Sequence, residues 1–390
     1  MLFGMRKPAY AVVALSIMFV LRTMGAQTLP RVFLVNPEKL AQAKRHPDAD
    51  ELRLAKEEAD RALRVQPMSV TTKGLTPTSG DKHDYMSMAR YWWPNPNTPN
   101  HLPYIRKDGQ SNPEIETIKD HEALTKTAES ARALAMGYYL TGDERYAEHA
   151  TLLLRTFFLD PKTAMNPNLR FAQAVMGVND GRGTGILDAR GLSMVVDAVG
   201  MLAGSKAWTP EEDAQLRTWF GEYYAWLTTS SPGKDEMAAK NNHGSWYAVQ
   251  QASIAQLLGK TDDVRRIAEQ VRDQRIPAQF DAQGMQKYEL VRTNSFSYSA
   301  FNLQALTELA DIVASTGIDL YKVKPGILTG IDALLPYDAE HLWPHEQISK
   351  GHEDSLCPAL MAAAAHTDDA KYTDAEARFG CKATAESRLE

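Results

Sequence analysis

The feature that most constrains the fold of this chain is a recurring pair of amphipathic helical stretches. Between Glu122 and Leu140 the apolar residues repeat at the helical period and form one stripe, made of Leu124, Ala128, Ala131, Leu134, Ala135 and Tyr138. After a Thr-Gly-Asp turn, a second stretch also has an apolar face, made of Tyr146, Ala150, Leu153, Leu154 and Phe157. Two such stripes joined by a short turn predict a helical hairpin.

The same pattern recurs along the chain. Residues 188–204 and 208–227 form a second pair, residues 245–260 and 261–274 form a third, and residues 295–315 carry a further apolar stripe. Thr209, Pro210 and Glu212 are predicted to be an N-cap, a first helical residue and the acid of a capping box, and Thr261 is predicted to cap the helix that follows. The sequence shows no alternation of strands and helices, so we predict an all-α fold.

Successive hairpins without a strict short repeat leave two architectures open, an α-solenoid and a closed (α/α) toroid. Long polar connections interrupt the helices at residues 71–118, 160–188, 228–242 and 276–294. Loops of this length in a compact domain are usually functional or disordered. Because these contain Trp, Tyr, Arg and Asn, a composition unlike that of disordered segments, we interpret them as the rim of a binding cleft.

The N-terminus has the layout of a secretory signal peptide. Arg6 and Lys7 precede an apolar run of 13 residues, and small residues follow near Ala26. The competing explanation is a membrane anchor, but the run is shorter than the roughly 20 residues that span a bilayer. We therefore expect residues 1–26 to be removed, leaving no stable membrane anchor and a periplasmic or secreted protein.

Charge and cysteine content limit the classes of partner. Residues 1–26 contain three basic side chains and no acid, so their removal changes the net charge from −6 to −9. A protein this acidic is a poor candidate for nucleic-acid binding, which requires a basic footprint. The two cysteines, Cys357 and Cys381, can form one disulfide in an exported protein or remain unpaired.

The stretch "AAKNNHGSWYAVQQ" places three polar residues, Asn241, Asn242 and His243, at a predicted helix start. Free N–H groups there favour a nearby anion and a neutral imidazole, which can donate or accept a proton near neutral pH. The competing explanation is that an asparagine caps the helix and His243 is structural, and for an isolated Asn-His pair that explanation is the stronger one.

A second candidate group lies in "KYELVRTNSFSYSAFN". Arg292 precedes a predicted helix and Tyr298 lies in its first turns. Arginine suits bidentate recognition of a carboxylate, and a tyrosine beside a cation can have a lowered pKa and act as base and acid. The competing explanation is a surface arginine and a tyrosine at the edge of the core.

Two polar loops add candidate binding residues. Residues 84–114 contain Tyr91, Trp92 and Trp93 before two prolines, in a setting of Asn and charge that favours sugar stacking over core packing. Residues 165–190 combine four glycines with Asn166, Asn168, Gln173, Arg182 and Arg190. The segment "GRGTG" lacks the preceding strand and the Lys-Ser ending of a phosphate loop, so we interpret it as a tight loop that presents amides and an arginine to a ligand.

Other chemistries have little support. Pro344 lies between His341 and His345 and argues against a helical zinc pair. There is no Gly-x-Ser-x-Gly elbow, and no pair of acids stands in a setting typical of glycoside hydrolysis. We expect no metal and no cofactor.

Taken together, "NNHGSWY", Arg292 with Tyr298, "YWWPNP", "MNPNLRFAQAVMGVNDGRGTGI" and "LWPHEQI" resemble the alginate-lyase superfamily of polysaccharide lyases, over roughly residues 35–364. The resemblance implies one domain over residues 27–390, an incomplete (α/α) toroid of five to seven helical hairpins with cleft-forming loops. It also implies metal-independent β-elimination at a 1,4-linked hexuronate by a monomer acting on an anionic polysaccharide.

The resemblance assigns roles to individual residues. Asn242, Arg292 and His243 would neutralise the C5 carboxylate, and Tyr298 would remove the C5 proton and protonate O4, with His243 as the base when the proton lies on the opposite face. The expected substrate-binding residues are Arg90, Tyr91, Trp92, Trp93, Asn168, Gln173, Arg182, Asn241, Trp246, Tyr288 and His345.

Alternatives remain for both the substrate and the class of reaction. Mannuronate and glucuronate share their configuration at C4 and C5, so these residues do not separate alginate from glucuronan. The alternatives to a lyase are an (α/α)-barrel glycoside hydrolase acting on acidic oligosaccharides and a sugar-binding or scaffold protein without catalysis.

Overall fold

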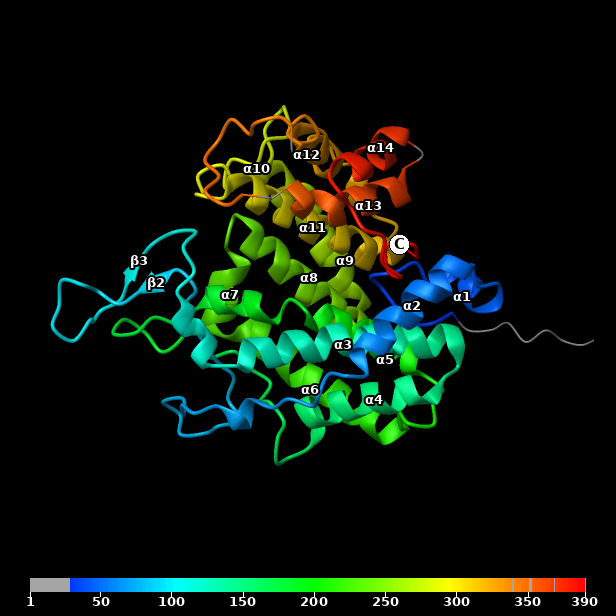
Figure 1. The fold of residues 1–390 in the computed structure, drawn as a ribbon, viewed down its shortest axis with the longest axis horizontal. Helices are drawn as coiled ribbons and strands as arrows, with labels where there is room; N and C mark the ends of the chain where they lie inside the picture. Colours follow the sequence, from blue (N-terminus) through cyan, green and yellow to red (C-terminus); the bar gives the residue numbers. More distant parts are fainter. Residues whose placement is uncertain (1–28, 339, 351–352, 368, 390) are drawn as a thin grey trace, which may run out of the picture.

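The computed structural model describes residues 29–338, 340–350, 353–367 and 369–389, and the described chain is mainly helical (Figure 1). The expected signal peptide, residues 1–26, lies outside the described residues. The α-helices are α1 (Pro37–Arg45), α2 (Ala49–Ala62), α3 (Asp120–Thr141), α4 (Glu144–Leu154), α5 (Leu192–Leu202), α6 (Pro210–Thr229), α7 (Ser231–Met237), α8 (Asn242–Leu257), α9 (Thr261–Gln270), α10 (Ile276–Gln279), α11 (Ser295–Val313), α12 (Ile327–Leu334), α13 (Cys357–His366) and α14 (Ala370–Arg378).

The helices form an inner row and an outer row. Within the described residues, α3, α5, α8, α11 and α13 pack against one another in succession, and each is followed in the chain by an outer helix, α4, α6, α9, α12 or α14. Residues near the C-terminus connect the last of these helices to the first, because Glu386 pairs with Arg132 of α3 and Glu58 of α2 accepts from the N–H of Ala385. The fold is an all-α toroid, as predicted, and its described part contains five inner–outer pairs.

The apolar stripes predicted from the sequence line this core. On α3 the predicted stripe is fully buried from Leu124 to Ala135, and Gly142 ends the helix in the left-handed conformation. Thr209 and Glu212 form the predicted capping box of α6. The prediction for Thr261 is wrong: it is the first residue of α9, Lys260 occupies the N-cap position, and no side chain caps that helix.

The long connections contain more structure than expected. Strand β1 (Met86–Met88) pairs in parallel with β4 (Phe171–Ala174), and β2 (Trp92–Trp93) pairs antiparallel with β3 (Ile105–Arg106). The β2–β3 hairpin projects from the helical body (Figure 1). Residues 228–242, predicted as a loop, contain α7, and residues 276–294 contain α10. These segments carry too few apolar positions for a helical period to be visible in the sequence.

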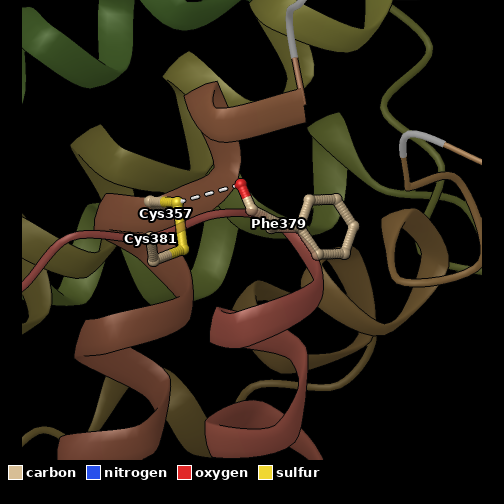
Figure 2. The surroundings of a disulfide bond; sticks show 3 residues. All are labelled: Cys357, Phe379 and Cys381. Carbon is tan, nitrogen blue, oxygen red and sulfur yellow. Dashed lines mark hydrogen bonds between the residues drawn. A yellow bond between two sulfur atoms is a disulfide. The ribbon is translucent and has the colours of Figure 1, made fainter.

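A disulfide joins Cys357, at the start of α13, to Cys381, after the end of α14 (Figure 2). The Cys357 sulfur also lies near the carbonyl oxygen of Phe379. The bond ties the last helical hairpin to the segment that closes the ring. Among the described residues no helix is long and apolar enough to cross a membrane.

Candidate active site

A cavity of about 570 Å³ opens where the long connections meet the ends of the inner helices. Ten of the residues singled out from the sequence line it: Arg90, Tyr91, Trp92, Gln173, Arg182, Arg190, Asn241, His243, Arg292 and Tyr298. Lining residues that the sequence did not single out as binding or catalytic residues are Arg106, His121, Thr184, Leu187, Asp188, Ala239 and Phe301. The predicted cleft rim and most of the predicted site therefore lie together.

Tyr298 lies in the first turns of α11 and is partly buried. Its hydroxyl lies 2.6 Å from that of Tyr91, and the guanidinium of Arg292 lies 3.8 Å from the centre of its ring. Burial raises the pKa of Tyr298, the Tyr91 hydroxyl raises it further, and the charge of Arg292 only partly opposes this. The net shift is therefore opposite to the lowering expected from the sequence.

Arg292 is held by a carboxylate from the distant β2–β3 segment. Its Nε and Nη2 atoms donate to Asp108 at 3.2 and 2.9 Å, a bidentate arrangement, and Thr293 donates to the same carboxylate. Burial opposes ionisation of Asp108, but these contacts outweigh it and lower the pKa of Asp108 to about 2. Burial likewise disfavours the charged form of Arg292, but Asp108 more than compensates, so the pKa of Arg292 is raised. Arg292 thus remains charged and stacked on Tyr298.

His243 lies in the first turn of α8 and bonds to an acid of α7. Its Nδ1 atom is 2.6 Å from Oε1 of Glu236, a carboxylate with only 2% of its surface exposed. This bond orients the ring and leaves Nε2 as the nitrogen available for a ligand. The α8 start packs too closely for a side chain at Gly244, where an added Cβ would lie 2.1 Å from both the carbonyl oxygen of Ala239 and a guanidinium nitrogen of Arg275.

Asn242 lies beneath the cavity, fully buried, and does not line it. Its backbone N–H and its Nδ2 donate to the two oxygens of Glu289, at 2.6 and 2.8 Å. Asn241 is at the N-cap position but makes no capping bond with its side chain, so Glu289 supplies the acceptor at this helix start. Burial is the main reason that the pKa of Glu289 is raised to about 7.

Arg182 lies on a different wall of the cavity. Its Nε and Nη2 atoms donate to the backbone and side-chain oxygens of Gln173, and its guanidinium lies 6.0 Å from the ring of Trp92. Asp188 is the one acid among the described residues that line this cavity, and it accepts from Tyr85, Ser87 and Gln173.

Five of the predicted binding residues do not line the cavity. Trp246 is buried against Phe301, and the indole N–H of Trp93 donates to the carbonyl of Gln110. The remaining three also lie elsewhere: Asn168 contacts Asp84, Tyr288 lies beside Lys287, and exposed His345 contacts Trp343. Of the lining residues missed, His121 has the one visible signal, because it follows the acid at the start of a long helix much as His243 begins α8.

A second hollow of about 530 Å³ shares Tyr91, Tyr298 and Phe301 with the first. Its other lining residues include Asn294, Ser297, Gln304 and Asp354. Tyr91, Tyr298 and Phe301 therefore lie at the boundary between the two hollows. Within the described residues, no group of three or more His, Cys, Asp and Glu side chains is placed to hold a metal ion.

The comparisons with known proteins identify the family and support the fold. A sequence model of the family described as "Alginate lyase" matches residues 69–343. The crystal structure of an alginate lyase from Bacteroides ovatus superposes with a TM-score of 0.86 at 35% sequence identity, covering 93% of this chain and 98% of that one. A search of curated proteins finds no match.

Proposed function

The chain belongs to the alginate lyase family and is a polysaccharide lyase with an anionic polysaccharide substrate, and from that premise we propose that it cleaves 1,4-linked polyuronates by β-elimination. The observation that carries the proposal is the stack of Arg292 on Tyr298 beside His243 in a cavity rich in arginine. Three of these arginines, Arg90, Arg182 and Arg190, pair with no acid among the described residues. Their positive charge matches a polymer that has a carboxylate on each sugar.

In the proposed reaction Tyr298 handles both protons. The Tyr298 phenolate takes the C5 proton, the C4–O4 bond breaks as the C4=C5 double bond forms, and the resulting phenol gives its proton to O4 and returns to the phenolate. Because the raised pKa of Tyr298 keeps the hydroxyl protonated before substrate binds, that proton first leaves to solvent. Arg292, held over the ring by Asp108, stabilises the phenolate before the first transfer and after the second.

His243 acts on the C5 carboxylate of the reacting sugar. When both ring nitrogens carry a proton, Nδ1 donates to Glu236 and Nε2 donates to the C5 carboxylate or to the carbanion-like centre that develops beside it. For a substrate whose C5 proton lies on the other face, the same nitrogen serves as the base and Tyr298 as the acid. Asn242 supports this arrangement from below, through Glu289, and not by direct contact with the sugar.

A substrate panel tests the proposal. Polymannuronate, polyguluronate and glucuronan are incubated with the folded protein, and the ultraviolet absorbance of the unsaturated uronate is followed. We expect absorbance to rise on at least one polymer and to persist after treatment with a metal chelator. No absorbance on any of the three, with folding verified by circular dichroism, would disprove the proposal.

The same panel separates the lyase from the glycoside hydrolase. A hydrolase would release reducing ends without the unsaturated product and would depend on a pair of acids. The described cavity offers only Asp188, and three neutral donors already occupy that carboxylate.

The N-terminal pattern supports a further part of the proposal, that residues 1–26 direct export to the periplasm or the medium. Sequencing the N-terminus of the exported protein tests this, and an intact Met1 in the exported form would contradict it.

A further inference from the structure

Arg182 is held in the cavity wall by contacts that the elimination step does not use. Its Nε donates to the carbonyl oxygen of Gln173 at 3.1 Å, and its Nη2 donates to Oε1 of the same residue at 2.9 Å. Both acceptors are neutral, and no acid among the described residues forms an ion pair with this arginine. The guanidinium is therefore fixed in position without a direct ion pair, although the charges of Asp188 and Glu236 act on it from farther away.

The glycines around Arg182 explain how closely it is held. A Cβ at Gly181 would lie 2.1 Å from the carbonyl oxygen of Arg170, and one at Gly185 would lie 2.5 Å from the Cβ of Ala172. The turn before and after Arg182 thus packs against β4 more closely than any side chain would allow. The segment "GRGTG" is built to place this arginine beside the strand.

Gln173, which holds Arg182, has a strained backbone conformation. Its φ of +50° lies in the left-handed region, which non-glycine residues adopt at a cost of roughly 1 kcal/mol or more. The conformation is fixed because its N–H donates to Ser87 at 2.8 Å and its Nε2 donates to Asp188 at 2.9 Å. In this conformation both oxygens of Gln173 accept from Arg182.

A second cation stands close to the first. Arg106 also lines the cavity, and after burial its charge is the next cause that lowers the pKa of Arg182. Arg106 pairs with Asp108 at 2.7 Å, but that carboxylate also holds Arg292. One acid therefore serves two arginines. With Asp108 and Asp188 both counted, the arginines that line the cavity still outnumber the acids, so the wall has a net positive charge suited to an anion.

We propose that Arg182, with Arg106 beside it, is a second anion site that binds the carboxylate of a uronate neighbouring the one that reacts, and that Gln173 positions it. The inference rests on the proposed function and narrows the substrate class. It requires polymers with free carboxylates on neighbouring sugars. Polyuronates in which these groups are esterified, or in which neutral sugars separate the uronates, are then poor substrates.

Substitution of Arg182 tests the site. In Arg182→Gln we expect KM for polymannuronate, or for the panel polymer that the wild type cleaves fastest, to rise about tenfold or more, because one charge-assisted hydrogen bond is lost. The kcat should stay within about threefold, since the group acts on binding and not on the reacting atoms. Arg106→Gln should raise KM less. Arg170→Gln, an exposed arginine outside the cavity, is the matched control and should change neither constant.

Gln173→Glu tests the positioning role. A carboxylate at this position would pair with Arg182 and fill the site from within. It would also replace the donor to Asp188 by an acceptor, so the stability of each variant is measured alongside KM. We expect KM to rise as in Arg182→Gln, with no further rise in the double variant, whereas a merely structural defect would add to the first. Binding of the same polymer to variants that also carry Tyr298→Phe, measured by calorimetry, gives the dissociation constants without turnover.

The outcomes separate the two proposals. An active wild type with unchanged KM and unchanged dissociation constant in Arg182→Gln would overturn this inference alone, as would a fall in kcat at constant KM. A wild type that forms no unsaturated product would instead remove the proposed function.

Discussion

At the scale of single residues, the site depends on Tyr298, whose neighbours shift its pKa in opposite directions. Burial and the hydroxyl of Tyr91 keep Tyr298 protonated, whereas Arg292 on its ring favours the anion. A group balanced in this way gives and takes a proton only when a substrate brings both partners to it.

Tyr298→Phe removes the hydroxyl and leaves the ring under Arg292. We expect kcat to fall by at least about a hundredfold, the usual contribution of a positioned acid–base group, with KM within about threefold. Steady-state rates of double-bond formation measure both constants. Tyr146→Phe, which loses a hydroxyl bonded to Asp60 outside the cavity, is the control and should keep kcat. Near-normal turnover in Tyr298→Phe would show that another group moves the protons.

Asp108→Asn tests whether the position of Arg292 matters as much as its presence. The amide loses the charge that pairs with Arg292, so the guanidinium is free to leave the ring of Tyr298. We expect kcat to fall about tenfold, a typical effect of removing a supporting partner. Because the pKa of Asp108 is lowered to about 2, its carboxylate is ionised at every working pH, and the variant should not alter the acid limb of the pH profile. Asp50→Asn, an exposed acid of α2, serves as the control, and equal rates in both variants would contradict the role.

At the scale of elements, the sequence predicted what local patterns specify. The stripes of α3 and α11 and the capping box at Thr209 follow from spacing within one helix. The partners of the site residues did not follow, because Asp108 is 184 positions from Arg292 and Glu289 is 47 from Asn242. Nothing in "RKDG" or "KYEL" marks those acids as partners of a distant segment. The family resemblance implied that Trp246 binds substrate, but its position on α8 places it in the core.

The start of α8 offers a test at this scale. In Gly244→Ala the new methyl group would overlap the carbonyl of Ala239 and the guanidinium of Arg275, so the helix start must shift and carry His243 with it. We expect activity to fall at least about tenfold, together with a loss of stability of roughly 1–3 kcal/mol from overpacking. Gly221→Ala on α6 is the matched control, because nothing lies within 4 Å of its added Cβ. It should stabilise the protein by up to about 1 kcal/mol, measured by denaturant unfolding.

At the scale of the whole molecule, the toroid holds acids away from the cleft, with Asp197 buried and Glu308 and Asp311 partly buried. Asp197 of α5 accepts from the N–H groups of Phe33 and Leu34, and burial raises its pKa to about 7. On α11, burial raises the pKa of Glu308 to about 7 and that of Asp311 to about 8, and the charge of Glu386 adds to both shifts. These groups lie where the C-terminal segment contacts α3. We therefore expect the stability of this contact to depend on whether the three carboxyls are protonated.

The sign of the resulting pH dependence is fixed by these shifts. A carboxyl whose pKa is raised in the folded state binds its proton more tightly there than in the unfolded chain. The stabilisation is complete below the unfolded pKa of about 4 and is lost as the pH rises through 7 to 8, where Asp197, Glu308 and Asp311 ionise. We therefore expect the free energy of unfolding to be lower at pH 8.5 than at pH 5.5, by on the order of a few kcal/mol.

Glu308→Gln assigns part of this effect to one residue. The amide stays neutral at every pH, so it removes the cost of ionising Glu308 in alkaline solution and leaves acidic solution almost unaffected. We expect the difference in the free energy of unfolding between pH 5.5 and pH 8.5 to shrink in this variant, measured by urea titration at both values. Glu57→Gln, an exposed acid on α2, should leave the difference as in the wild type. A wild-type protein equally stable at both values, or more stable at pH 8.5, would mean that Asp197, Glu308 and Asp311 ionise without a cost to the fold.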